Sequence, residues 1–203
     1  MKILTAEILR YVMPNASANN CAVYAELINQ YAGAFGITTD IQLAHYLAQI
    51  AHESAELKYT EEIASGAAYE GRKDLGNVYP GDGKKYKGRG LIQITGRANY
   101  KAYNDYLTKT GMKVDLLKSP TLLSAPLGAT KSSLWFCKKH GVFDAALMDD
   151  GKTIVKSVKD RGKLKTVSVN ATLLKITRIV NGGYNGIEER NRYLRKAKYK
   201  LGV

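Results

Sequence analysis

The sequence lacks the long hydrophobic runs that membrane spans require. In its 203 residues no uninterrupted apolar stretch approaches the roughly 18 residues of a transmembrane helix. The first ten residues hold Glu7 and Arg10 where a secretory signal would need its apolar part, so they predict an amphipathic surface helix. We therefore expect a protein that has no integral membrane segment, is made in the cytoplasm, and reaches any external target by another route.

Cysteine is scarce, since Cys21 and Cys137 are the only two in the chain. Two cysteines do not make the disulfide framework that staples small secreted proteins. Both lie in apolar stretches with helical spacing, where a cysteine usually acts as a small buried hydrophobic residue. They therefore predict neither a metal site nor thiol catalysis.

Acidic residues are also few. The chain has 18 Asp and Glu against 31 Lys and Arg, which gives a formal net charge of +13. Such a field attracts polyanions, among them nucleic acid, anionic lipid, lipopolysaccharide and teichoic acid, and composition does not choose among them. Phe and Trp are rare beside 14 Tyr. Tyrosine suits sugar-binding grooves because it joins an apolar face to a polar tip, but most of these residues are expected at the edge of the core.

Helical patterns dominate the chain. Apolar residues recur at helical spacing over residues 20–36, where Gly36 is placed to end the helix. Thr39 and Gln42 match a capping box, which predicts a second helix that reaches about Leu57. The other predicted helices start near residue 99, at Pro120 and at Pro126 (the last of these to about residue 141), and cover residues 173–180 and 186–201.

Two stretches depart from this helical pattern. Residues 66–90 contain seven glycines and Pro80, which indicates loops with room for a short hairpin. Residues 153–158 and 164–169 predict two short strands joined by a turn. This basic hairpin of residues 150–170 is either a solvated edge protected by lysines, which we favour, or an arm that faces a cell wall. The fold class predicted from these patterns is α+β, predominantly α-helical, with small β-hairpins.

Glu53 is the first candidate for chemistry, because it lies three residues after Ile50 on the apolar side of its helix. Partial burial raises the pKa of a carboxyl group, as a general acid near neutral pH requires, and a solvated surface glutamate is the alternative. His52 and Glu53 also begin a zinc-protease motif, but Glu56 replaces its second histidine. Since His45 and His52 lack a third ligand, we predict no metal.

A glycosidase needs a second carboxyl group across the bond that it cuts. Glu56, Glu61, Glu62 and Glu70 all follow Glu53 closely. Nine residues of continuous helix would turn Glu62 about 180° away from Glu53. The two can therefore serve one site only if the helix ends and the chain folds back between them, which the sequence permits but does not require.

Glycines at positions 88, 90 and 96 bracket a short alternating segment. Its polar members Gln93 and Thr95 would share one face of a predicted strand. An amide and a hydroxyl on one face can bind sugar hydroxyls or hold a water molecule. The alternative interpretation, a loop–strand–loop whose polar groups bond only within the protein, is equally open. The segment matches neither the dinucleotide fingerprint nor the Walker phosphate loop.

Five short motifs follow one another along the chain. They are His52-Glu53-Ser54, Tyr69-Glu70-Gly71-Arg72, Gly81-Asp82-Gly83, Gly88-Arg89-Gly90-Leu91-Ile92-Gln93-Ile94-Thr95-Gly96 and Asn181-Gly182-Gly183. In this order the sequence resembles glycoside hydrolase family 19 over roughly residues 40–200. Within that family it is similar to the phage endolysin branch rather than to the plant chitinases, which carry a longer insert between their two glutamates and usually several disulfides.

The resemblance implies one lysozyme-like domain over residues 1–203, with two lobes and a cleft. In it Glu53 would protonate the leaving oxygen, Glu62 would activate water, and Thr95 would help to hold that water, although Glu61 competes with Glu62 for its role. Family members invert the anomeric centre, which requires carboxyl groups about 6.5–9.5 Å apart. The other residues expected around the sugar are His52, Tyr69, Gln93, Asn99 and Asn181, with Arg190 near the second carboxylate.

The resemblance also implies a reaction, namely hydrolysis of β-1,4 bonds in bacterial peptidoglycan by a monomer that uses no cofactor. A source in a phage, with release from the host cytoplasm to the wall through a separate holin, would fit the absence of a signal peptide. A secreted antibacterial effector would fit this absence almost as well. Anionic envelope polymers are expected as further partners and nucleic acid is not. The alternatives are a chitinase with the same catalytic residues, and a non-catalytic basic module whose salt-dependent binding would survive the loss of Glu53.

Overall fold

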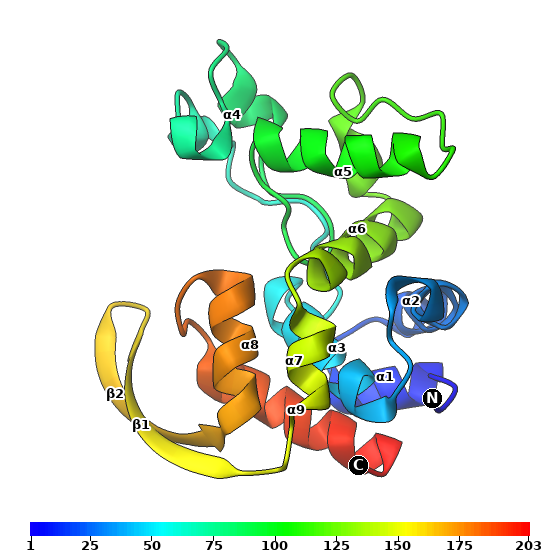
Figure 1. Cartoon of the computed structure of the whole chain (residues 1–203), viewed down its shortest axis with the longest axis vertical. Helices are drawn as coiled ribbons and strands as arrows, with labels where there is room; N and C mark the ends of the chain where they lie inside the picture. Colours follow the sequence, from blue (N-terminus) through cyan, green and yellow to red (C-terminus); the bar gives the residue numbers. More distant parts are fainter. The chain divides into compact units, whose positions relative to one another are not determined.

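The computed structural model describes residues 1–203 and divides into two compact units (Figure 1). Unit 1 comprises Met1–Lys58 and Phe136–Val203, and unit 2 comprises Tyr59–Trp135. Both are mainly helical, and the only sheet has two antiparallel strands. The predicted α+β, predominantly helical fold class is therefore confirmed, whereas the single domain over residues 1–203 stays a prediction.

Unit 1 is built around a central helix. Ten successive residues of α3 (Asp40–Glu53), from Gln42 to Ala51, are buried, as expected of a helix that is surrounded by other elements. Helices α7, α8 and α9 pack against it. The helices of this unit are α1 (Ala6–Val12), α2 (Ala18–Tyr31), η1 (Gly33–Phe35), α3, α7 (Val142–Leu147), α8 (Ala171–Asn181) and α9 (Ile187–Leu201).

The start of α3 agrees with the prediction, but its end does not. Thr39 and Gln42 form the predicted capping box. The helix then stops at Glu53 rather than near Leu57, because Ala55, Glu56 and Leu57 all adopt left-handed backbone angles (φ 49°, 60° and 65°). The chain thus turns sharply directly after Glu53, without a glycine to signal the turn.

Side chains from distant segments hold this turn in place. The Ser54 hydroxyl accepts from the backbone N–H of Leu57, and the side chain of Asn20 donates to the Leu57 carbonyl. The buried carboxylate of Glu56 accepts from Asn15 and from the Tyr193 hydroxyl. Left-handed residues with a side chain are unfavourable by about 1–2 kcal/mol each, so tertiary contacts of this kind have to offset the cost.

The hairpin of unit 1 confirms the predicted strands and extends them. Strand β1 (Thr153–Asp160) pairs with β2 (Lys163–Asn170) in a register that sets Thr153 opposite Asn170. Arg161 and Gly162 form the turn with positive φ angles of 48° and 81°, as tight hairpins favour. Figure 1 shows the pair as a curved ribbon beside α8 and α9.

Unit 2 has less regular structure. Its elements are η2 (Ala67–Tyr69), η3 (Lys73–Leu75), α4 (Asp82–Lys85), α5 (Arg97–Lys109), η4 (Pro120–Leu123) and α6 (Pro126–Lys139), whose last residues, from Phe136, belong to unit 1. Pro120 and Pro126 begin their helices as predicted. Tyr86, Tyr100 and Tyr103 are at most 2% exposed and form much of this unit's core.

One prediction for unit 2 was wrong, and another was left partly open. The segment 66–90, expected as loops with room for a short hairpin, holds 3₁₀ turns and α4 and no hairpin. The strand that was to carry Gln93 and Thr95 is a turn, in which Gln93 has a left-handed φ of 55° and only an isolated bridge joins Arg89 to Ile94. The backbone N–H of Gln93 donates to the Gly90 carbonyl, which closes the turn.

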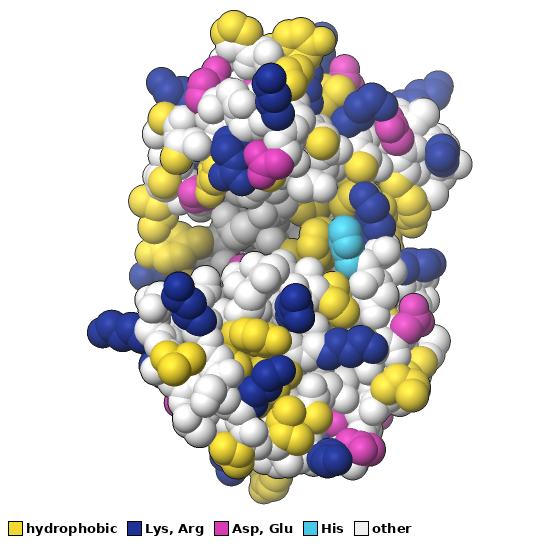
Figure 2. Space-filling view, turned by 60° about the vertical axis from the view of Figure 1, so that its left-hand side comes forward, with side chains coloured by type: hydrophobic (Ala, Val, Ile, Leu, Met, Phe, Trp, Pro, Cys, Tyr) yellow, Lys and Arg dark blue, Asp and Glu magenta, His cyan; other side chains and the backbone are white.

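Both cysteines are buried and free, which confirms that they act as hydrophobic residues. Burial raises the pKa of the thiols of Cys21 and Cys137, which disfavours thiolate chemistry. None of the helices combines the length and the apolar content needed to cross a membrane. On the face that Figure 2 shows, Lys and Arg side chains lie scattered among apolar and uncharged ones rather than in one continuous patch.

Candidate active site

Glu53 is the last residue of α3, and a buried arginine binds its carboxylate. Arg190 of α9 is fully buried, and its Nη2 donates to Oε1 of Glu53. Its Nη1 donates to Gln49 and its Nε to the carbonyl of Asn185. A buried guanidinium requires such partners. The Glu53 side chain is 17% exposed, and its second oxygen has no hydrogen-bond partner in the protein. That oxygen is free to hold a proton or to meet a ligand.

The neighbouring His52 is held by a second ion pair. Its Nδ1 lies 2.8 Å from Oε2 of Glu189, and Oε1 of Glu189 accepts from Arg161 in the hairpin turn at 3.2 Å. Burial, together with the charge of Arg190, lowers the pKa of His52. Burial would raise the pKa of Glu189, but His52 and Arg161 outweigh it and lower that pKa. The pair fixes the imidazole next to Glu53.

Asn181 also belongs to unit 1 and ends α8. It is exposed, and Gly182 after it adopts a left-handed φ of 73° that turns the chain. No hydrogen bond occupies the Asn181 side chain, so its amide is available to a ligand. The structure therefore agrees with a sugar-binding role for Asn181 without testing it.

In unit 2 the carboxylate of Glu62 accepts two hydrogen bonds. The Tyr69 hydroxyl donates to Oε1 at 3.0 Å, and the backbone N–H of Gly88 donates to Oε2 at 3.1 Å. A Cβ placed on Gly88 would lie 2.8 Å from Gln93 Oε1, 3.2 Å from Thr95 Oγ1 and 3.3 Å from Glu62 Oε2. The absence of a side chain on Gly88 thus lets a carboxylate, an amide and a hydroxyl gather closely against its backbone.

Glu61, the rival candidate, has a different environment. Its carboxylate forms ion pairs with Lys87 at 3.0 Å and Arg89 at 3.2 Å, and the Ser124 hydroxyl donates to it at 3.1 Å. Burial alone would raise the pKa of Glu61, but these partners outweigh it and lower the pKa. A carboxylate engaged by two cations is a structural brace and a weak base, so the geometry favours Glu62 over Glu61.

Gln93, Thr95 and Asn99 come together although no strand carries them. The Thr95 hydroxyl donates to the carbonyl of Gln93, and the Asn99 side chain donates to the carbonyl of Thr95. The Gln93 amide donates to the Gly90 carbonyl, and its Oε1 lies close to the backbone of Gly88. The turn therefore brings Gln93 and Thr95 close to Glu62 beside Gly88, although the predicted strand is absent.

Two of the recognised motifs brace each other. Glu70 accepts from the backbone N–H groups of Gly81 (2.6 Å) and Gly83 (2.8 Å), and Asp82 forms a bidentate ion pair with Arg97. These contacts connect η2, α4 and α5. The motifs therefore shape unit 2, and of their residues only Tyr69 contacts a candidate catalytic group.

The predicted site residues thus form two groups. Unit 1 holds His52, Glu53, Asn181 and Arg190, and unit 2 holds Glu62, Tyr69, Gln93, Thr95 and Asn99. Arg190 was expected near the second carboxylate, and the carboxylate that it binds within unit 1 is the first, Glu53. No group of three or more His, Cys, Asp or Glu side chains could hold a metal ion.

Sequence reasoning missed two residues of the first group. Gln49 lies four residues before Glu53 on α3, so helical spacing alone places it beside the acid. Glu189 precedes Arg190 and binds His52, and no sequence signal marks it. Gln49 thus holds Arg190, and Glu189 holds His52, two side chains that are predicted to lie around the sugar.

The order of the motifs and the two carboxylate environments can be compared with known proteins. A glycosyl hydrolase family 19 domain-containing protein of Haemophilus influenzae is 31% identical over 129 residues, which are 64% of this chain and 49% of that protein. A basic endochitinase of Brassica napus is 30% identical over 86% of this chain and 57% of its own length. Over most of its length the chain is therefore similar to members of glycoside hydrolase family 19.

Solved structures agree with this family's fold. A bacterial family 19 chitinase matches with a TM-score of 0.68 and 22% identity, over 100% of this chain and 96% of that one. Chitinase C from Streptomyces griseus matches with a TM-score of 0.64 and 21% identity, over 99% of this chain and 77% of that one. No protein-family model matches the chain. The chain spans between 33% and 57% of the length of several curated relatives that it matches.

Proposed function

We propose that the chain is a glycoside hydrolase that cleaves β-1,4 bonds between the amino sugars of bacterial peptidoglycan. One observation carries the proposal. The carboxylates of Glu53 and Glu62 can each accept a further hydrogen bond from a ligand. Those of the neighbouring Glu56 and Glu61 are occupied by structural hydrogen bonds and ion pairs. Similarity to family 19 supports the same pair as acid and base.

Glu53 is the proposed general acid. Arg190 holds Oε1, so the proton that is given to the leaving oxygen resides on Oε2. The hydrogen bond orients the carboxyl group, and Gln49 and Asn185 in turn orient the arginine. Positioned proton transfer of this kind contributes about 10²–10⁴-fold to a rate.

Glu62 is the proposed base that activates water. The polar groups of Glu62, Gln93 and Thr95 gather around Gly88, and together they supply the several hydrogen-bond partners that one bound water molecule needs. Tyr69 and the Gly88 N–H hold the carboxylate in place. Attack by this water on the face opposite the leaving group would invert the anomeric centre.

Peptidoglycan is proposed as the substrate on the basis of charge and of the endolysin-like motif pattern. A net charge of +13 favours an anionic envelope over neutral chitin. We further propose a monomeric phage endolysin that is made in the host cytoplasm and released to the wall. Chitin is the second candidate, because several of the similar curated proteins are named endochitinases.

The test measures reducing ends released from purified sacculi and from chitin oligomers. We expect Glu53→Gln and Glu62→Gln to lose about 10²–10⁴-fold in rate while remaining folded. Glu61→Gln is the matched control, and it should keep its rate within about tenfold because Glu61 only braces the loop. Full activity without Glu53, or a deep loss in Glu61→Gln with Glu62→Gln active, would contradict the assignment. Release from chitin alone would replace peptidoglycan by chitin as the substrate.

A further inference from the structure

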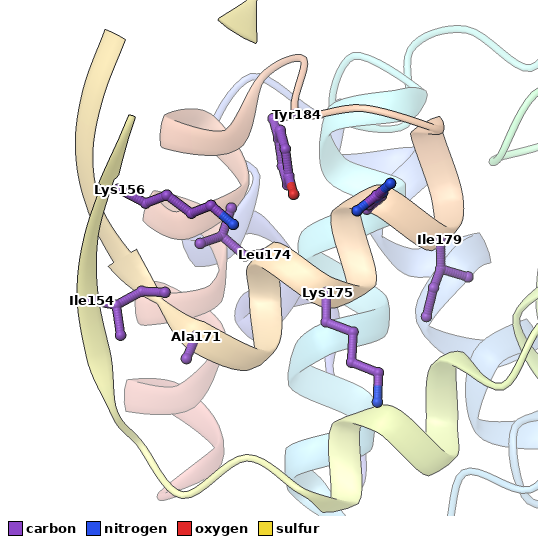
Figure 3. Close-up of a pocket in the computed structure, with 8 residues that line it drawn as sticks. Ile154, Lys156, Ala171, Leu174, Lys175, Ile179 and Tyr184 are labelled. Atoms are coloured by element: carbon purple, nitrogen blue, oxygen red, sulfur yellow. The ribbon is translucent and has the colours of Figure 1, made fainter. Parts of the chain in front are cut away.

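A pocket of about 500 Å³ lies between the hairpin and α8 in unit 1 (Figure 3). Its residues are Ile154, Lys156, Ala171, Leu174, Lys175, Arg178, Ile179 and Tyr184. Figure 3 shows Lys156 extending from β1 toward Leu174 of α8, with Tyr184 close by. This is within the range of volumes that small ligands occupy in proteins.

The charges around this pocket are unbalanced. Lys156, Lys175 and Arg178 contribute three cations, and the lining contains no carboxylate. None of the three forms an ion pair, and the only aromatic contact among them is that of Lys156, whose Nζ lies 5.7 Å from the centre of the Tyr184 ring. An anion would therefore meet three unpaired positive charges.

Other basic residues of the hairpin are neutralised. Lys165 pairs with Glu188 at 2.9 Å, and Arg161 pairs with Glu189 at 3.2 Å. Lys156 lies on the same side of β1 as the buried residues Val158 and Asp160, since side chains alternate along a strand. Protection of the sheet edge by Lys156 would not explain the two unpaired cations opposite it, Lys175 and Arg178 of α8.

The uncharged part of the lining indicates the shape of the ligand. Ile154, Ala171, Leu174 and Ile179 offer apolar surface, and Tyr184 offers a ring face. A bare ion would leave this surface uncovered, whereas a sugar or an amino acid with an acidic group would cover it. Asn181, a predicted sugar-binding residue, ends α8 three residues before Tyr184.

We propose that this pocket binds the carboxylates of peptidoglycan, carried by its lactyl groups and peptide stems, and so distinguishes it from neutral chitin. The proposal rests on the proposed function, because it assigns the pocket to the same glycan. Arg178 can bind a carboxylate with two parallel hydrogen bonds, and Lys156 and Lys175 add positive charge.

The test is calorimetric binding at about 0.15 M salt, where long-range attraction is screened. The Glu53→Gln protein is used because it should bind the glycan without turnover. It is titrated with three compounds, namely a disaccharide-tetrapeptide with free carboxyl groups, the same compound with its carboxyl groups amidated, and chitotetraose. In this background Lys156→Gln/Arg178→Gln should weaken binding of the acidic compound by about three- to tenfold, since each exposed charge contributes modestly. Binding of the amidated compound and of chitotetraose should change less than about twofold.

Arg195→Gln/Lys196→Gln is the matched control. It removes the same number of positive charges from unit 1, but at another basic surface, on α9, and should leave all three affinities unchanged. Equal weakening by the two double variants, equal weakening for the amidated compound, or no binding of the acidic compound would overturn the proposal. Sugar release from peptidoglycan is measured separately, with Glu53 intact. Sugar release by a protein whose binding does not depend on the pocket cations defeats only this inference. Binding that depends on those cations, without any sugar release, defeats only the proposed function.

Discussion

Replacing Asp149 by asparagine should destabilise unit 1 by about 1–3 kcal/mol. The Asp149 side chain is fully buried, and each of its oxygens accepts two hydrogen bonds. Oδ2 accepts from His45 of α3 at 2.9 Å and from Lys198 of α9 at 3.2 Å. Oδ1 accepts from Asn170 at 2.7 Å and from the N–H of Gly151 at 2.9 Å. The residue therefore ties the helices that carry Glu53 and Arg190 to the end of β2.

The magnitude follows from the four donors around this carboxylate. An asparagine has one oxygen and one NH₂ group, so either orientation sets the NH₂ against two donors. One buried donor, His45 or Asn170, then loses its acceptor, which is unfavourable by about 1–3 kcal/mol, and a solvent-accessible donor, Lys198 or Gly151, loses its acceptor as well. Asp150→Asn is the control, because Asp150 is exposed and caps only the neighbouring N–H of Lys152. Its effect should stay within about 0.5 kcal/mol.

Urea unfolding followed by circular dichroism measures both free energies, and its pH dependence adds a second check. Burial alone would raise the pKa of Asp149, but the hydrogen bonds from His45, Asn170, Gly151 and Lys198 outweigh it and lower the pKa well below its usual range. The unfolded carboxyl titrates near about pH 4. The contribution of Asp149 is thus complete above that pH and is lost as the pH falls toward the folded pKa. A loss below about 1 kcal/mol at neutral pH, or an equal loss in Asp150→Asn, would refute the reasoning.

Three further outcomes are expected. Ala55→Gly should raise the free energy of unfolding by about 0.5–1 kcal/mol, because Ala55 is exposed at a left-handed φ of 49°, and a lower urea midpoint would contradict this. Gly186→Ala should lower it by about 2 kcal/mol or more, since the new Cβ would lie 1.9 Å from the His52 ring, whereas Gly182→Ala, with a similar φ and open space, should show only the smaller backbone cost. The His52 ring should titrate in an NMR experiment with a midpoint below about 6.5, so that stability rises with pH between the folded pKa and that value, and a higher midpoint would disprove the assigned effect of burial.

Local signals in the sequence predicted the elements whose causes are local. The capping box of Thr39 and Gln42 begins α3, and alternating β-branched residues around a turn form the hairpin. The end of α3 could not be predicted, because its left-handed residues depend on Asn15, Asn20 and Tyr193, which are distant in the sequence. Here tertiary contacts override the local preference of the backbone.

The same distinction applies to the candidate site. Motif order selected Glu53, Glu62 and Thr95, and their immediate surroundings agree with these choices. The strand predicted for Gln93 was wrong, since alternation of polar and apolar residues cannot reveal a left-handed residue within it. The choice between Glu61 and Glu62 required the positions of Lys87 and Arg89, which sequence spacing does not provide.

The ion pair of Glu53 and Arg190 has a consequence for the timing of synthesis. The two residues are 137 positions apart. At about 5–20 residues per second, a ribosome needs roughly 7–27 s to travel from one to the other. During that interval α3 can form, but no guanidinium is available to orient its terminal carboxylate. A nascent chain in which α9 has not yet been made therefore has no assembled acid group, and a cell that makes this protein does not meet the proposed activity before translation has passed Arg190.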